Sequence, residues 1–342
     1  MKKVVSFGEI MMRLVPPGYL RINQAHALEM TFGGAEANVA VSLANYGVPV
    51  TYLTRMPQND IAETCLQQLR GFGVDVSHVA RGGDRLGIYF AEKGASMRPS
   101  KVIYDRKYAS IATIEPGDID WASAFEGADW FHFTGITPAL SEKTAAATLE
   151  ACKIAKSMGL TISCDLNYRK NLWSREQAKK TMTALMAYVD VMIANEEDSQ
   201  DVFGIAAEGA DIEGGALSVE GYRGLARKLA QTFDCKKVAF TLRESFSAND
   251  NGWSGLLYDA AADSATVSRK YSIHIVDRVG GGDSFGAGLI YALRAGESDE
   301  NAINFAVAAS ALKHTIEGDF NRVTLREVQT LMGGSVSGRV QR

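Results

Sequence analysis

Three consecutive glycines followed by an aspartate, Gly280-Gly281-Gly282-Asp283, stand near the end of the chain. The apolar run at 289–293 predicts that a helix begins here. Backbone amides without side-chain cover at the start of a helix favour an anion such as phosphate, and they hold a nearby carboxylate in its ionised form. Asp283 can then accept a proton from an alcohol. A base beside a phosphate site predicts phosphoryl transfer to a hydroxyl group.

The same residues fit a simpler role, a glycine-rich turn in which Asp283 caps the following helix. The stretch is not a P-loop, because no Lys follows its last glycine. It also differs from a dinucleotide-binding fingerprint, because Phe285 stands where a small residue is needed and the stretch does not follow the first strand. The choice between a turn and an anion site therefore depends on the rest of the chain.

Composition narrows the class of protein. The chain has 342 residues, of which 46% are hydrophobic and 22% charged, as in a soluble globular enzyme with one large α/β core. Lys and Arg number 36 against 40 Asp and Glu, so we expect neither nucleic acid nor an anionic membrane as a partner. The sequence contains no signal peptide and no membrane-spanning run, which predicts a cytoplasmic protein.

Cysteine and histidine residues are scattered without the spacing of metal ligands. We therefore expect reduced, mostly buried thiols in place of a disulfide framework or a zinc site. The cysteines are Cys65, Cys152, Cys164 and Cys235.

Strand and helix patterns alternate along most of the chain. Strands are predicted at 4–9, 130–134, 161–166, 189–194 and 237–242, helices at 143–158, 175–188, 221–233 and 299–313, and β-rich stretches at 253–258 and 266–275. Alternating strands and helices with right-handed crossovers form a parallel sheet covered on both faces, which binds ligands at the carboxyl ends of its strands. We expect a single domain over 1–342 with a flexible tail from 333.

Two short alternating segments at 86–92 and 101–106, joined by a Gly/Ser/Pro turn, predict a hairpin. We interpret it as part of a small antiparallel sheet attached to the main body, a lid built mainly from segments near 10–32 and 84–110. Alternation along these strands aims Tyr89, Tyr104 and Arg106 at a cleft. A hairpin whose face is merely solvated is the alternative.

Further polar residues stand at expected strand ends. The pair Gly33-Gly34 lets backbone approach a ligand closely, and Asn38 offers a donor and an acceptor to a polyol, although tight helix packing also explains the pair. Arg169, just after the strand at 161–166, is suited to bidentate binding of a carboxylate or phosphate. A salt bridge with a neighbouring acid is its alternative role.

Two of these stretches, Gly33–Asn38 and Asp277–Phe285, resemble the paired signatures of the ribokinase-like (PfkB) carbohydrate kinases at the family's separation. The resemblance covers essentially the whole chain. It implies a ribokinase-like three-layer αβα sandwich with a mostly parallel central sheet and a small β-sheet lid. Ser6–Leu14, Tyr104–Arg106 and Asp165–Arg169 are most similar to kinases of 2-keto-3-deoxygluconate, which implies ATP-dependent formation of 2-keto-3-deoxy-6-phosphogluconate.

The resemblance also implies roles for individual residues. Asp283 would be the base, and the amides of Gly280, Gly281 and Gly282 would stabilise charge on the transferred phosphoryl group. The sugar acid would be bound by Gly34, Asn38, Tyr89, Tyr104, Arg106 and Arg169, whose guanidinium groups suit a carboxylate. The nucleotide would lie against Asn167, Asn195, Thr241, Arg243, Ser245, Gly280 and Gly282, beside a helix at 305–309. Asp198 would hold Mg²⁺ through water.

Several positions depart from the family pattern. Arg278 and Gly281 replace a Thr and an Ala of the second signature, and the stretch after Thr241 lacks the glycines that the family places there. Asp198 replaces a Glu, and Val307 stands where an Asn near adenine is common. These departures leave the nucleotide donor and the role of Arg278 open.

Two other functions remain open at this stage. One is a kinase of the same fold for a neutral sugar such as fructose, ribose or a nucleoside. The other is a sugar-acid sensor that binds its ligand without turnover. In each case the lid hairpin leaves strand edges exposed, so we expect a homo-oligomer formed through the lid.

Overall fold

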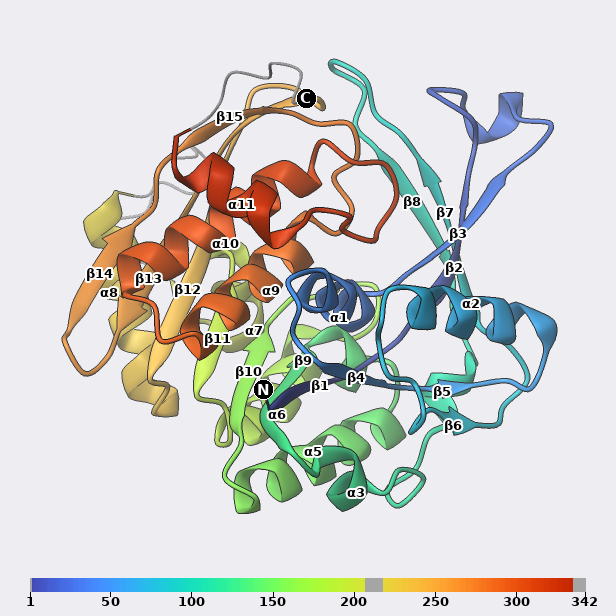
Figure 1. The fold of residues 1–342 in the computed structure, drawn as a ribbon, viewed down its shortest axis with the longest axis horizontal. Helices are drawn as coiled ribbons and strands as arrows, with labels where there is room; N and C mark the ends of the chain where they lie inside the picture. The colour runs from blue at the N-terminus through green and yellow to red at the C-terminus, as the bar shows by residue number, and fades with distance from the viewer. Residues whose placement is uncertain (1, 207–217, 335–342) are drawn as a thin grey trace.

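The computed structural model describes residues 2–206 and 218–334. Within them, a nine-stranded sheet forms the centre of the main body (Figure 1). In spatial order it contains β14 (Ser264–Val267), β13 (Asp250–Asp259), β12 (Lys237–Ser245), β11 (Val191–Ala194), β10 (Thr161–Asp165), β9 (Ala128–Thr134), β1 (Lys3–Phe7) and β4 (Val50–Leu53), and β15 (Tyr271–His274) also pairs with β13. The strands from β12 to β4 are parallel, and β13, β14 and β15 join antiparallel at one edge.

Different helices cover the two faces of this sheet. One face carries α1 (Ala35–Asn45), α2 (Asp60–Gly71), α9 (Gly281–Arg294), α10 (Asp299–Lys313) and α11 (Leu325–Met332); the other carries α3 (Trp121–Phe125), α5 (Glu142–Ser157), α6 (Arg175–Met186), α7 (Glu196–Phe203) and α8 (Val219–Phe233). Along β11, Val191 and Ile193 pack on the first layer, and Met192 and Ala194 pack on the second. This alternation, in a strand buried on both faces, confirms the predicted αβα sandwich.

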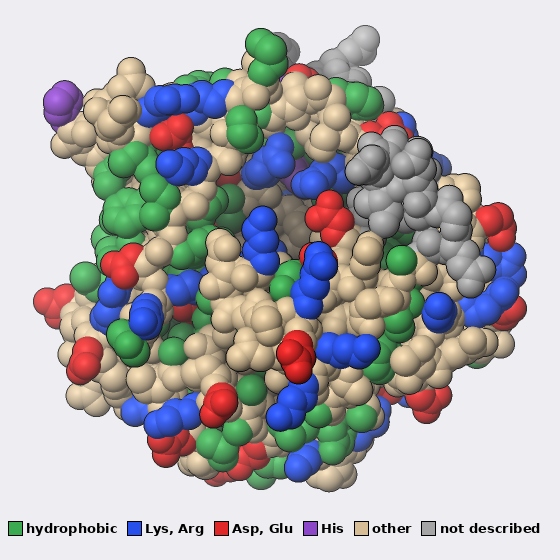
Figure 2. All heavy atoms as spheres, turned by 180° about the vertical axis from the view of Figure 1, so that it is seen from behind, with side chains coloured by type: hydrophobic (Ala, Val, Ile, Leu, Met, Phe, Trp, Pro, Cys, Tyr) green, Lys and Arg blue, Asp and Glu red, His purple; other side chains and the backbone are tan. Residues whose placement is uncertain are grey.

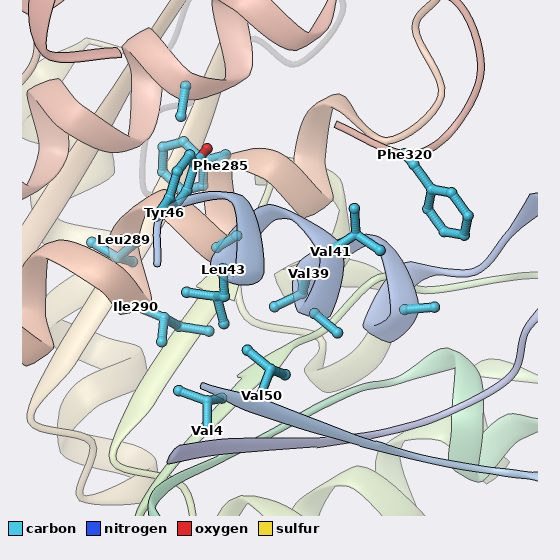
Figure 3. Close-up of a cluster of buried hydrophobic side chains, with 14 of the residues drawn as sticks. Val4, Val39, Val41, Leu43, Tyr46, Val50, Phe285, Leu289, Ile290 and Phe320 are labelled. Carbon is cyan, nitrogen blue, oxygen red and sulfur yellow. The ribbon is translucent and has the colours of Figure 1, made fainter. Parts of the chain in front are cut away.

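The core on the first face brings the two glycine-rich stretches together (Figure 3). Val39 and Leu43 of α1 lie between Val4 and Val50 of the sheet on one side and Leu289 of α9 on the other. Burial of each such side chain contributes roughly 1.5–3 kcal/mol. The packing therefore holds the N-terminal ends of α1 and α9, which carry Asn38 and Asp283, at the same edge of the sheet.

The lid is a separate four-stranded sheet in the order β3 (Glu29–Gly33), β2 (Met11–Val15), β7 (Gly87–Glu92) and β8 (Lys101–Asp105). The expectation of a wholly antiparallel sheet is wrong, because β2 and β7 pair in parallel. Each hairpin is antiparallel within itself, but α1, β4 and α2 lie between the two hairpins in the chain. This long crossover lets the second hairpin enter the lid in the same direction as the first.

Smaller elements complete the described chain. They are β5 (Arg55–Met56) paired with β6 (Ala80–Arg81), α4 (Ile136–Ala139) and two short 3₁₀ helices, Ile22–Gln24 and Ser110–Thr113. The β-rich stretch expected at 266–275 is divided between β14 and β15. The four cysteines are free and buried, as expected. None of the helices described is long and apolar enough to cross a membrane, and the tail from 335 lies outside the described residues.

Candidate active site

A cavity of about 390 Å³ lies where the carboxyl ends of the parallel strands meet the N-terminal ends of α1 and α9, beneath the lid. The face shown in Figure 2 is hollowed near its centre, and Lys and Arg side chains gather around the hollow. The cavity brings together most of the residues predicted from the sequence. These are Gly34, Asn38, Tyr89, Tyr104, Arg106, Asn167, Arg169, Asn195, Asp198, Thr241, Arg243, Gly280, Gly282 and Asp283.

Gly281 and Ser245 are the predicted site residues that do not line this cavity. Gly281 packs against His314, and a Cβ atom at this glycine would lie 2.4 Å from the imidazole Cε1. Ser245 ends β12 and accepts a hydrogen bond from Asn251 Nδ2 at 3.1 Å. Close packing against His314 thus accounts for a glycine at position 281, which the sequence analysis assigned to phosphate binding.

The structure shows where two departures from the family pattern lie. The stretch after Thr241, which lacks the family's glycines, continues β12 to Ser245 and pairs with β13. Arg278 lines the cavity and donates a hydrogen bond to the carbonyl of Ala248 at 2.9 Å, so it faces the site.

The helix segment 305–309, which is predicted to border the nucleotide, does not line this cavity. Its residues belong to the buried core, where Val307 is fully buried. Gly288 of α9 allows this close packing, because a Cβ atom there would lie 2.9 Å from the Cα atom of Ala306. The end of α10 reaches the cavity only through His314, which follows the helix.

Asp283 lies in the first turn of α9, directly after the glycine turn. Gly280 precedes the helix with φ +83°, a left-handed conformation that favours glycine, and a Cβ atom there would lie 2.4 Å from the carbonyl oxygen of Asp319. Asn38 Nδ2 donates to Asp283 Oδ2 at 2.7 Å. Among the described residues nothing donates to Oδ1, which leaves this oxygen able to accept a proton.

The pKa of Asp283 is raised to about 6, mainly because burial disfavours the charged carboxylate; the hydrogen bond from Asn38 opposes this effect. The sequence analysis predicted surroundings that keep this carboxylate ionised, and the raised pKa corrects that prediction. In the folded chain, burial raises the pKa of Asp283 by more than the positive end of the helix lowers it. A base with this pKa is still mostly ionised at neutral pH and is well matched to proton transfer.

We expect kcat/KM to fall about tenfold for each pH unit below about 6, as Asp283 becomes protonated, and to level off above it. Asn38→Ala should move this acid limb to higher pH, because the hydrogen bond from Asn38 lowers the pKa of Asp283. Initial rates measured between pH 5 and pH 8 would check both expectations. Asn45→Ala, on the same helix but bonded to the carbonyl of Asn321, should leave the limb in place. An unchanged limb in Asn38→Ala would contradict the assignment.

The two predicted arginines have different surroundings. Arg106 forms an ion pair with the buried Glu9 through Nη2, and its guanidinium carbon lies 5.0 Å from the centre of the Tyr104 ring. Arg169 is exposed at the cavity and forms no ion pair with any residue that the structure describes. Its Nη1 donates only to the neighbouring carbonyl of Tyr168, at 3.2 Å. The alternative role of Arg169 as a salt-bridge residue is therefore not realised.

Tyr89 belongs to a buried charge network that the sequence did not indicate. Its hydroxyl donates to Asp319 Oδ1 at 2.5 Å. Arg13 of β2 donates to Asp319 Oδ1 and Asp277 Oδ2, each at 2.6 Å, with 2% of its side chain exposed. Asp277 also accepts from the amides of Val279 and Gly318. The network ties lid strands β2 and β7 to the residues that lead into the glycine turn.

Arg13→Met should lower the free energy of unfolding by about 3–5 kcal/mol, because it leaves two buried carboxylates without their cation. Urea denaturation at neutral pH would measure the loss. Lys270→Met is a suitable control: it breaks a pair with Glu244 in which both side chains are about half exposed, so a change within about 1 kcal/mol is expected. Equal stabilities of the two variants would show that the network contributes little.

The acidic residues of the cavity fit a magnesium ion held mainly by water and phosphate. Asp198 Oδ1 accepts from the amide of Tyr168 at 3.0 Å, and burial raises the pKa of Asp198 to about 6. Asn195 caps α7 by accepting from the amides of Glu197 and Asp198. In the part of the chain that the structure describes, no three acidic, His or Cys side chains form a metal cage. Mg²⁺ normally keeps several waters, so Asp198 alone suits the water-mediated role predicted for it.

Glu9 and Glu36 line the cavity but were missed by the sequence analysis. Glu36 Oε1 accepts from the Thr134 amide at 2.9 Å and from the Thr134 and Thr137 hydroxyls at 2.8 Å, which joins α1 to the end of β9. Burial raises its pKa to about 7. Glu9 had a usable signal, because it directly follows the glycine after the first strand. Glu36 had none, since a Glu in the first turn of a helix is common.

Comparison with known proteins matches this arrangement. A model of the pfkB family of carbohydrate kinases matches residues 1–322. The crystal structure of a 2-dehydro-3-deoxygluconokinase from Thermotoga maritima is similar with a TM-score of 0.94 and 46% sequence identity, covering 98% of this chain and 100% of that one. A 2-dehydro-3-deoxygalactonokinase from Haloferax volcanii is 35% identical over 337 residues, 98% of each chain. A 2-dehydro-3-deoxygluconokinase from Thermoproteus tenax is 29% identical over 328 residues, 93% of this chain and 90% of that one.

Proposed function

This chain belongs to the pfkB family of carbohydrate kinases, and from its site we propose that it phosphorylates 2-keto-3-deoxygluconate, with ATP as the donor and Mg²⁺ as the metal ion. The product is 2-keto-3-deoxy-6-phosphogluconate. The similar proteins from Thermotoga maritima and Thermoproteus tenax are named for this substrate under its other name, 2-dehydro-3-deoxygluconate.

The guanidinium group of Arg169, unpaired among the described residues, is the observation that supports a sugar acid as the substrate. It is a guanidinium group at the cavity that no described carboxylate pairs with, and the base Asp283 lines the same cavity. A neutral sugar offers no group that pairs with this charge. The carboxylate of an aldonate does, and guanidinium binds it in bidentate fashion.

The mechanism follows from the positions of the side chains. The lid strands and Arg169 hold the sugar acid with its terminal hydroxyl beside Asp283. Oδ1 of Asp283 accepts the hydroxyl proton as the oxygen attacks the terminal phosphorus of ATP, and the bond to the leaving ADP oxygen breaks. Amides of the glycine turn at the start of α9 stabilise charge on the transferred group.

The nucleotide occupies the side of the cavity formed by the end of β12 and the glycine turn. Thr241 and Arg243 of β12 and Arg278 border this side. The guanidinium groups of Arg243 and Arg278 can offset the charge of the phosphates. Asp198 and Asn195 would hold Mg²⁺ through water, and the ion would neutralise phosphate charge during transfer.

The galactonate-derived epimer is a second candidate substrate, because the Haloferax volcanii relative is named for it. The two acids differ in the direction of one hydroxyl group. Release of ADP, measured by a coupled assay with both acids, fructose, ribose and a nucleoside, tests the proposal. We expect turnover of the sugar acids, with the gluconate-derived acid preferred. Turnover of a neutral sugar alone, or binding without ADP release, would refute it.

Self-association through the lid is the second part of the proposal. The edge strand β8 exposes Val102, Ile103 and Tyr104 by 38%, 41% and 42%. Figure 2 shows hydrophobic side chains gathered on the lid side of that face. Covering them with a second copy would also protect the strand edge. Light scattering at micromolar concentration should give a mass above that of one chain. The cytoplasmic location remains a prediction.

A further inference from the structure

Glu9 is a buried acid that the proposed mechanism does not use. It follows the end of β1 and lines the cavity, with 2% of its surface exposed. One carboxyl oxygen, Oε2, forms the ion pair with Arg106. Among the described residues nothing donates a hydrogen bond to the other oxygen, Oε1. Buried carboxyl oxygens normally have a partner, so a missing partner at a cavity wall indicates a ligand group.

Two glycines lie close to Glu9, and one of them lies close to Oε1. Gly87 of β7 lies beside it, and a Cβ atom at this position would lie 3.0 Å from Oε1. Gly34 meets the backbone of Glu9 so closely that a Cβ atom would lie 1.9 Å from its carbonyl oxygen. The Gly34 amide donates to Asn38 Oδ1 at 3.4 Å, and Asn38 donates in turn to Asp283. One continuous wall thus leads from Glu9 to the catalytic carboxylate.

We propose that Glu9 hydrogen-bonds a hydroxyl group of the sugar acid through Oε1 and thereby contributes to substrate specificity. The inference rests on the proposed function for the identity of that acid. A hydroxyl can both donate and accept, so the pairing holds whether or not the carboxyl carries a proton. A hydroxyl is also the abundant polar group along the chain of an aldonate.

Because Glu9 pairs with Arg106, we expect two separate parts of the cavity wall, at Glu9 and at Arg169, to contact the substrate. Glu9 offsets the charge of Arg106 and, together with the Tyr104 ring, fixes its position. Of the two arginines predicted to bind the substrate, Arg169 is the one without a carboxylate partner among the described residues. The carboxylate of the substrate therefore pairs with Arg169, while the hydroxyl-bearing part of the chain lies against Glu9.

Glu9→Ala, which removes the carboxyl group, tests this assignment when it is combined with substrate analogues. We expect kcat/KM for 2-keto-3-deoxygluconate to fall about 10- to 100-fold, as for loss of a hydrogen bond to a charged group, with KM for ATP unchanged. With analogues that lack the hydroxyl at C4 or at C5, the variant and the wild type should become nearly equal for one of the two. That cancellation identifies the hydroxyl that Glu9 contacts.

A purely structural role for Glu9 predicts a different result. If Glu9 only positions Arg106, the variant loses the same factor with every analogue, which would overturn the proposal, as would no loss at all. Thermal unfolding checks that the variant is folded, and Glu9→Asp, which keeps the charge but shortens the side chain, is the second variant. Wild-type turnover of the acid in the same assay tests the proposed function separately. If only a neutral sugar were turned over, its deoxy analogues would still test Glu9.

Discussion

The Asp283→Asn variant should lose about 10³- to 10⁴-fold in kcat, while KM for the sugar acid changes little. Asn has nearly the shape of Asp and can keep a hydrogen bond to Asn38, which now holds Asp283 at 2.7 Å. It cannot accept the proton of the attacking hydroxyl, so the chemical step loses its base while binding is retained. Steady-state rates at pH 7.5 with saturating ATP would measure the loss.

Asp299→Asn is the matched control for this variant. Asp299 also lies in the first turn of a helix, α10, but it pairs with Lys237 and is absent from the cavity lining. Its substitution should leave kcat within about twofold of the wild type, as expected for a site away from the chemistry. If Asp283→Asn retained kcat within a factor of ten, Asp283 would not be the base, which would have to be sought elsewhere.

The Arg169→Leu variant should lose about 10²-fold in kcat/KM for the sugar acid, mainly through KM. A loss of this size in kcat/KM is expected when a charge-assisted contact to the substrate carboxylate is removed. The bound substrate helps to exclude water from the site, which strengthens that contact. Any residual activity towards a neutral sugar should be unchanged, because that substrate has no carboxylate. Rates with both kinds of substrate, at a fixed ATP concentration, would give the comparison.

Two further variants make the result specific to Arg169. Arg169→Lys should recover only part of the loss, because an ammonium group keeps the charge but not the bidentate geometry. Lys170→Leu removes the same charge from the next residue, which lines a neighbouring cavity but not the one that contains Asp283, and should have little effect. A loss of similar size with Lys170→Leu, or with neutral sugars, would mean that Arg169 acts through the general field of the cavity and not through a carboxylate.

The fold could be predicted from local patterns because each element carries its own signal. The run Val191–Ala194 is apolar throughout, which is typical of a parallel strand buried on both faces, and the structure places it in the centre of the sheet. The helix α10 has the predicted bounds, 299–313. The direction of the lid strands was not predictable in the same way, because it depends on how the chain returns to the lid after crossing the main body.

The charge network around Arg13 shows where local reasoning ends. Arg13 is separated by 264 residues from Asp277 and by 306 from Asp319, so no periodicity or spacing connects them. In the sequence, Arg13 is one cation within a lid strand of otherwise apolar residues. Only the folded chain places it under the glycine turn, where two carboxylates offset the cost of its burial.

By itself, the sequence determined the sandwich architecture, the glycine turn before α9 and the acid that follows this turn. Residue type and close spacing carry that chemistry within one segment. The tertiary structure alone decided how the two substrate arginines differ. Glu9 and Arg106 are 97 residues apart and become an ion pair only because the lid lies over the end of β1, which leaves Arg169 for a carboxylate. A charge in the sequence does not specify its partner; desolvation and distance in the folded chain do.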